Sequence, residues 1–253
     1  MNLFDITGRK AIVTGAAQGL AYGMAEGLME SGAEVCIIDI NPKAVEVAAG
    51  FVEKGYKCHA VLANLGDRDQ LRKAFGEAVE KLGGRLDILV PAAGIQKRHF
   101  SEEFPVEDWD AVININLNAV FMLDQLAGQQ FIKQQSKGKI VNIASMLSFF
   151  GGYTVPAYAA SKGGVAQLTK ALSNEWASKG ITVNAIAPGY MATEMNTALI
   201  NDDNRNTEIL ARIPAHRWGT PDDMKGLVVF LSSDASDYLN GAIIPCDGGY
   251  LSR

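Results

Sequence analysis

Short apolar runs alternate with segments of helical periodicity along the whole chain, and this alternation constrains the fold more than any other feature. The runs of strand length cover residues 10–14, 34–39, 57–63, 86–90, 138–144, 181–187 and 241–249. Because helices fit between them, successive strands need crossover connections and run parallel. We therefore predict one α/β domain over residues 1–253, with a doubly wound, parallel, seven-stranded sheet and helices on both faces.

A glycine-rich turn follows the first strand. Gly15 and Gly19 separate that strand from a helical pattern that carries Met24 and Leu28 and stops at Gly32. Glycines let the backbone approach a pyrophosphate, and the free N–H groups of a helix N-terminus attract its charge. This arrangement is typical of a Rossmann-type domain, although tight turns also need glycine for purely structural reasons.

The second strand ends at Asp39, about 20 residues after Gly19, where such domains place an acidic residue. Its carboxylate can accept hydrogen bonds from the ribose hydroxyls of NAD, and it would repel the 2′-phosphate of NADP. No basic residue stands at Gln18 or directly after Asp39. We therefore predict NAD as the cofactor; the alternative is that Asp39 only caps the turn before Pro42.

Tyr158 and Lys162 lie four residues apart in a helical pattern that begins near Pro156. Side chains at this spacing are neighbours on one helix face. A free phenol has a pKa of about 10, and an adjacent ammonium group lowers it. Ser145 ends the preceding strand, so its hydroxyl can reach the same reacting oxygen. Together they predict a proton donor and acceptor beside a carbonyl-sized site, although this spacing also occurs by chance.

Ligands of doubly wound sheets bind at the carboxyl ends of the strands. That edge collects Gly15, Asp39, Asn64, Gly94, Ser145 and Pro188. Asn64 and Leu65 are placed to flank an adenine ring. The helical stretch 106–135 carries Asn114, Asn116 and Asn118, and spacing alone does not choose among them. Residues 190–214 form a long polar excursion, which predicts a substrate lid.

Composition narrows the partners and the compartment. The formal net charge of −5 predicts no general attraction to nucleic acid or to an anionic membrane. Cys36, Cys58 and Cys246 lie far apart, without a metal-ligand spacing, and are interpreted as buried free thiols. No apolar run approaches membrane-spanning length, and the first residues lack a signal-peptide core, so we expect a cytoplasmic protein.

Five sequence blocks in this order resemble the short-chain dehydrogenase/reductase family over essentially the whole chain. They are Thr14-Gly15-x3-Gly19, Asn142-Ile-Ala-Ser145, Tyr158-x3-Lys162, Asn184-Ala-Ile-Ala-Pro-Gly189 and Asp247-Gly-Gly249. The resemblance implies that Tyr158 is the catalytic acid and base and that Ser145 holds the substrate oxygen. It also implies that Lys162 binds the nicotinamide ribose and lowers the pKa of the tyrosine.

The resemblance further implies that Asn116 is a proton-relay residue and that Thr193 contacts the nicotinamide carboxamide. It suggests a homotetramer, and the apolar stripe from Val165 to Trp176 fits either a subunit-facing helix or a core helix. The expected cofactor site comprises Gly15, Gln18, Gly19, Leu20, Asp39, Asn64, Leu65, Ala92, Gly94, Tyr158, Lys162, Pro188, Gly189, Met191 and Thr193.

Two departures from the family pattern concern the cofactor turns. Ala21 stands where a third glycine is usual, and a methyl group can be accommodated there. Pro91 and Ala92 replace the Asn-Asn of an Asn-Asn-Ala-Gly turn, which removes side-chain hydrogen bonds that steady the central strand. We expect this second change to lower stability rather than abolish activity.

Blocks around Ser145, Gly189 and Arg217 resemble family members that act on 2-dehydro-3-deoxy-D-gluconate or gluconate. They imply a sugar-acid substrate, whose carboxylate needs a cation and whose hydroxyls need polar groups. The expected substrate residues are Gln96, Arg98, Ser145, Met146 and Arg217. We expect Arg98 or Arg217 to bind the carboxylate; the alternative is that both are solvated surface cations.

Other functions stay open. Within the family, the chain could be a gluconate 5-dehydrogenase, or could reduce a keto-uronate or a 3-oxoacyl thioester. A different class of function is an NAD-binding sensor without turnover. The presence of Ser145, Tyr158 and Lys162 together argues for an enzyme.

Overall fold

The computed structural model describes residues 2–253, and every side chain in that range except that of Met195; Met1, the first residue of the expected domain, lies outside it. One seven-stranded sheet has the strand order β3-β2-β1-β4-β5-β6-β7, with every neighbouring pair parallel. Its strands are β1 (Lys10–Thr14), β2 (Glu34–Asp39), β3 (Cys58–Leu62), β4 (Ile88–Val90), β5 (Gly138–Ile143), β6 (Ile181–Pro188) and β7 (Ile243–Cys246). The predicted parallel, doubly wound sheet is confirmed.

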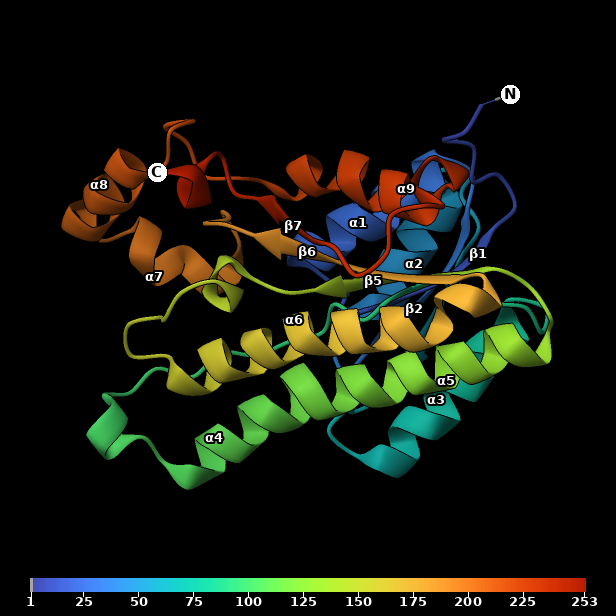
Figure 1. Ribbon diagram of the computed structural model, residues 1–253, viewed down its shortest axis with the longest axis horizontal. Coiled ribbons are helices and arrows are strands. Elements are labelled where there is room, and N and C mark those ends of the chain that lie inside the picture. Colours follow the sequence, from blue (N-terminus) through green and yellow to red (C-terminus); the bar gives the residue numbers. More distant parts are fainter. Residues whose placement is uncertain (1) are drawn as a thin grey trace.

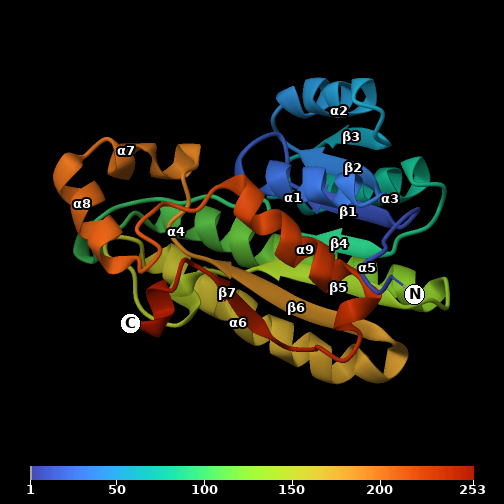
Figure 2. The same cartoon turned by 90° about the horizontal axis from the view of Figure 1, so that it is seen from above.

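Helices cover both faces of the sheet (Figure 1). One face carries α1 (Gly19–Glu30), α2 (Lys43–Glu53) and α9 (Lys225–Ser232), and the other carries α3 (Arg68–Lys81), α4 (Val106–Ile113), α5 (Ala119–Lys133) and α6 (Pro156–Trp176). Successive strand residues point to opposite faces, so Val13 and Ile12 belong to separate cores. Figure 2 shows the two layers from above.

Local sequence signals set the ends of the helices. Asp67 caps α3 by accepting hydrogen bonds from the amides of Asp69 and Gln70. Pro156 begins α6, and Gly180 has a φ of +75°, in the left-handed region that favours glycine. The stripe on α6 faces inward, because Leu172 and Trp176 belong to the core beneath it. The stripe is therefore a core feature.

The stretch predicted as one helix at residues 106–135 contains a π-helical turn, η2 (Asn114–Asn118), between α4 and α5. Such turns insert one extra residue into a helix and occur frequently at functional sites. Here the turn directs Asn116 inward, and its side chain is fully buried.

The polar excursion at residues 190–214 contains two helices, α7 (Thr197–Ile200) and α8 (Asp203–Arg212). Asp202 caps α8 by accepting hydrogen bonds from the amides of Asn204 and Arg205. Figure 1 places both helices beside the C-terminus, at the end of the molecule far from the N-terminus. In the described part of the chain, no helix combines the length and apolarity needed to cross a membrane.

Candidate active site

A cleft of about 790 Å³ opens at the carboxyl edge of the sheet. Residues from the turns after β1, β2, β3, β4, β5 and β6 line it. Every residue expected to bind the cofactor lies on its wall, from Gly15 at one end to Thr193 at the other. The edge of the sheet thus brings together positions that are far apart in the sequence.

The turn before α1 is shaped for a phosphate group. Gly15 and Gly19 have φ values of +75° and +64°, and a Cβ atom on Gly15 would lie 2.7 Å from the Cα of Ala93. Gln18 is the N-cap of α1, and no described side chain caps the amides of the first turn. These amides, at the positive end of the helix dipole, fit a pyrophosphate.

Asp39 is 8% exposed, and both of its carboxylate oxygens are held by the backbone. Oδ2 accepts a hydrogen bond from the amide of Ala17 at 2.9 Å, and Oδ1 accepts one from Asn41 at 2.9 Å. Two oxygens offer about four acceptor positions, so two remain for ribose hydroxyls. Asp39 therefore both organises the glycine turn and fits a ribose.

The altered turn after β4 retains part of its hydrogen bonding. The amide of Ala93 donates to the Thr14 hydroxyl at 3.0 Å, which ties this turn to the end of β1. Ala92 and Gly94 lie on the wall of the cleft. At the other departure from the family pattern, Ala21 is buried in the core beside α9. The turn after β4 is therefore held by a hydrogen bond to Thr14, and Ala21 is held by core packing within α1.

Ser145, Tyr158 and Lys162 meet in the cleft. The ammonium nitrogen of Lys162 donates to the carbonyl of Ile143 at 2.6 Å and lies 5.6 Å from the centroid of the Tyr158 ring. Burial lowers the pKa of Lys162 to about 8, so the ammonium form still predominates at neutral pH. Its remaining donors fit the hydroxyls of a ribose.

The pKa of Tyr158 is raised from its ordinary value, because burial disfavours the phenolate. A hydrogen bond with Ser145 acts in the opposite direction and is the smaller effect. The expected lowering of this pKa by Lys162 is therefore wrong for the net shift. Spacing on a helix indicates that two side chains are neighbours, but it does not indicate how far each is removed from water.

Asn116 clamps the segment after β4. Its Oδ1 accepts from the amide of Ile95 at 2.9 Å, and its Nδ2 donates to the carbonyl of Ile95 at 2.9 Å and to the Ser161 hydroxyl at 3.3 Å. Asn114 instead donates to the carbonyl of Gly66. Of the two, Asn116 is thus the asparagine tied to the helix of Tyr158.

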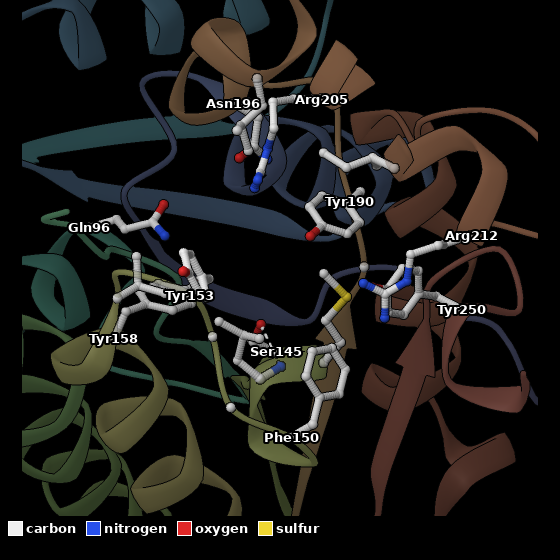
Figure 3. A pocket seen from close by; sticks show the side chains of 18 of the residues that line it. Gln96, Ser145, Phe150, Tyr153, Tyr158, Tyr190, Asn196, Arg205, Arg212 and Tyr250 are labelled. Atoms are coloured by element: carbon white, nitrogen blue, oxygen red, sulfur yellow. Dashed lines mark hydrogen bonds between the residues drawn. The ribbon is translucent and has the colours of Figure 1, made fainter. Parts of the chain in front are cut away.

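A second cavity of about 360 Å³ adjoins the cleft and shares Ser145 and Tyr158 with it (Figure 3). Gln96, Arg98 and Met146, three of the residues expected at the substrate, line this cavity. Arg217 does not line it, because its guanidinium forms a bidentate ion pair with Asp223, with N–O distances of 2.7 and 2.6 Å. Arg217 is therefore removed from the expected substrate residues.

The cavity also has walls that sequence reasoning missed. They include Tyr153, Tyr190, Asn196, Arg205, Glu208, Arg212 and Tyr250. Arg205, Glu208 and Arg212 are three and four residues apart along α8, the spacing of one helix face, so a helical reading of residues 203–212 would have grouped them.

Comparison with known proteins places these features in a family. Residues 15–251 match the family described as Enoyl-(Acyl carrier protein) reductase. The 2-dehydro-3-deoxy-D-gluconate 5-dehydrogenase of Dickeya dadantii (strain 3937) is 46% identical over 254 residues, with 100% of this chain and 99% of that protein covered. The chain belongs to the short-chain dehydrogenase/reductase family.

Solved short-chain dehydrogenases have the same fold. A protein from Agrobacterium tumefaciens with bound NADP is 47% identical, with a TM-score of 0.94 and full coverage of both chains. A gluconate 5-dehydrogenase from Burkholderia cenocepacia J2315, in complex with NADP and tartrate, is 39% identical, with a TM-score of 0.95 and coverage of 100% of this chain and 98% of that one. The chain is an oxidoreductase of this family that acts on CH–OH groups, and these relatives support a nicotinamide cofactor.

Proposed function

We propose that the protein is an NAD-dependent 2-dehydro-3-deoxy-D-gluconate 5-dehydrogenase. The observation that carries the proposal is the position of Ser145 and Tyr158, at the junction of a dinucleotide cleft and a cavity lined by arginines. A reacting CH–OH group at that junction faces the cofactor on one side and polar side chains on the other. The similarity to the Dickeya dadantii enzyme supports the choice of sugar acid.

The nicotinamide ring, when bound, takes up or supplies the hydride. In the direction of oxidation, the phenolate of Tyr158 accepts the proton of the substrate hydroxyl, while the hydroxyl of Ser145 holds the developing carbonyl oxygen. The ammonium group of Lys162 stabilises the phenolate and holds ribose hydroxyls. Asn116, buried beside the helix of Tyr158, belongs to the route by which the proton leaves.

Arg98 is our choice for the substrate carboxylate, since it lines the cavity and forms no ion pair with any residue in the described range. We expect Arg98→Ala to raise the KM for the sugar acid about 10- to 100-fold, the worth of a charged hydrogen bond. Arg217→Ala is the matched control, because Arg217 is committed to Asp223 outside the cavity. An unchanged KM in Arg98→Ala would end this assignment.

NAD is proposed over NADP because Asp39 puts a negative charge where the 2′-phosphate of NADP would lie. The relatives from Agrobacterium tumefaciens and Burkholderia cenocepacia were solved with NADP, so both cofactors must be assayed in parallel. A higher kcat/KM with NAD supports the proposal, and a preference for NADP contradicts it.

We also propose a cytoplasmic homotetramer. Cys36, Cys58 and Cys246 are free thiols, which suit a reducing compartment. Val106, Trp109 and Phe121 expose 68%, 39% and 42% of their surface on α4 and α5, and such apolar side chains on one layer fit a subunit interface.

The test of function is NADH formation by the purified protein with 2-dehydro-3-deoxy-D-gluconate, gluconate, simple polyols and 3-hydroxyacyl thioesters. Turnover of 2-dehydro-3-deoxy-D-gluconate well above all the others supports the proposal. Turnover confined to gluconate would make the protein a gluconate 5-dehydrogenase, the activity named for the Burkholderia cenocepacia relative. Binding of NAD without any turnover would favour a sensor.

A further inference from the structure

The α8 helix presents a charged face to the substrate cavity. Arg205, Glu208 and Arg212 line the cavity together with Ile209, and they follow the spacing of one helix face. In Figure 3 the guanidinium of Arg205 points toward the middle of the cavity, on the side opposite Ser145 in that view, whereas Arg212 lies against Tyr250. The centre of the Arg212 guanidinium is 4.7 Å from the centroid of the Tyr250 ring.

Arg98 reaches the same cavity from the segment that follows β4. Neither the guanidinium of Arg98 nor that of Arg205 has an ion-pair or hydrogen-bond partner among residues 2–253, and Glu208 pairs with neither; the Asp202 side chain accepts only from the backbone amide of Arg205. Partial burial lowers the pKa of Arg98, Tyr190 acts in the opposite direction, and the like charge of Arg205 is a smaller effect that also lowers it. Two unpaired guanidinium groups that repel each other across a cavity suit an anion between them.

We propose that Arg98 and Arg205 hold the same substrate carboxylate, so that a bound acid fastens the first turn of α8 over the cavity. This rests on the proposed function, since it names the receptor of a sugar-acid carboxylate. Each guanidinium offers a planar fork of N–H donors, and a carboxylate has acceptor positions for both. Specificity for an acid over the corresponding alcohol then comes from two segments that are far apart in the sequence.

The contacts that hold α8 in place lie after Arg205 along the helix. Ile209 and Ile213 are buried at its C-terminal end, and Asn206 accepts a hydrogen bond from the indole of Trp218 at 2.8 Å. Arg205 stands before these anchors and is exposed. A carboxylate contact there adds a restraint at an exposed position of the helix.

A double-mutant cycle with Arg98→Ala, Arg205→Ala and the double variant tests whether the two arginines share one carboxylate. We expect each single variant to lower kcat/KM for 2-dehydro-3-deoxy-D-gluconate about 10- to 100-fold. The fold-loss of kcat/KM in the double variant should be much smaller than the product of the two single fold-losses, because each arginine binds the carboxylate less tightly once the other is removed. Arg205→Lys keeps the charge but not the planar fork of donors. Its kcat/KM should lie between that of the wild type and that of Arg205→Ala.

Hydrogen exchange of α8 gives a readout that does not need turnover. With NADH present, D-gluconate should slow exchange of the α8 amides in the wild type, and D-glucitol, which has an alcohol in place of the carboxylate, should not. Arg205→Ala should abolish the protection, whereas Arg217→Ala, outside the cavity, should keep it.

Three outcomes would overturn the shared receptor. They are additive losses in the cycle, equal protection of α8 by D-glucitol, or a loss of acid specificity in Arg212→Ala without one in Arg205→Ala. If the wild type turns over the sugar acid in any of these cases, the proposed function stands and the receptor alone fails. If D-gluconate protects α8 but no sugar acid is oxidised, the receptor stands and the proposed function fails.

Discussion

Tyr158 is the residue on which the pH dependence rests. Oxidation needs its phenolate, and burial raises its pKa from the ordinary value near 10, so the reactive form is scarce at neutral pH. We expect kcat/KM for oxidation to rise about tenfold per pH unit between pH 6 and 8, and the reverse reaction, which needs the phenol, to show no such rise. Initial rates in both directions across this range measure it.

Tyr158→Phe is the control for that profile. It removes the proton acceptor and should lower kcat by about two to four orders of magnitude while leaving NADH binding in place. An oxidation rate that is already flat at pH 6 in the wild type would show that a group with a much lower pKa limits the reaction.

The proposed choice of NAD over NADP rests on Asp39. Asp39→Asn removes the negative charge and keeps an oxygen that can accept from one of the two backbone amides that Asp39 now serves. We expect kcat/KM with NADP to rise and kcat/KM with NAD to fall, each by about tenfold or more. Steady-state kinetics with both cofactors check this, and an unchanged ratio would mean that Asp39 only shapes the turn.

At the scale of elements, Asp124 on α5 is a fully buried carboxyl group that faces the sheet. Its Oδ2 accepts from the Asn142 side chain on β5 at 3.1 Å, while Asp124 Oδ1 and Asn142 Oδ1 have no hydrogen-bond partner among the described residues. Burial raises the pKa of Asp124 to about 8. A protonated carboxyl group therefore fits this place between α5 and the sheet.

The sign of the linkage follows from that raised pKa. Between the unfolded value near 4 and the folded value near 8, folding takes up a proton, so stability falls by up to about 1.4 kcal/mol per pH unit as pH rises. Asp124→Asn, nearly the same shape without the proton, should remove this slope. Urea unfolding of both proteins at pH 5, 6, 7 and 8 measures it, and parallel slopes would assign the pH dependence elsewhere.

Some elements could not be foreseen from sequence patterns. The π-helical turn at Asn114–Asn118 leaves the apolar periodicity of its surroundings nearly intact, so it is invisible until the hydrogen bonds are known. The α8 helix is polar on most of its surface and begins within an Asn- and Asp-rich stretch, residues 201–206, so its sequence is typical of a loop. Its Asp202 cap is a signal that could have revealed it.

For the whole molecule, the sheet and the place of the site follow from the sequence, because alternating strands and helices allow few topologies. Gly15, Asp39, Ser145 and Tyr158 reach one edge for that reason. The position of Arg217 could not be foreseen, since its partner Asp223 is set by the capping geometry at Thr220. Charge chemistry alone does not reveal which cations are already paired.

The proposed homotetramer gives a test at this scale. Phe121→Glu places a charge on an apolar side chain that is 42% exposed on α5, so a packed interface would have to bury an unpaired carboxylate. We expect light scattering to detect tetramers of the wild type and smaller species of the variant. Lys43→Glu, on α2 across the sheet, is the control that should remain tetrameric. Tetramers in both variants would place the interface elsewhere.

The two backbone contacts of Asp39 bear on how proteins of this kind can evolve a preference for the other nicotinamide cofactor. A substitution of Asp39 that admits a phosphorylated ribose also removes the hydrogen bonds from the amides of Ala17 and Asn41. A gain in affinity for NADP is therefore accompanied by a less stable glycine turn. Adaptation toward that cofactor should therefore proceed through prior stabilising mutations elsewhere. Ancestral proteins that already carried such mutations would be the ones able to change their cofactor from NAD to NADP.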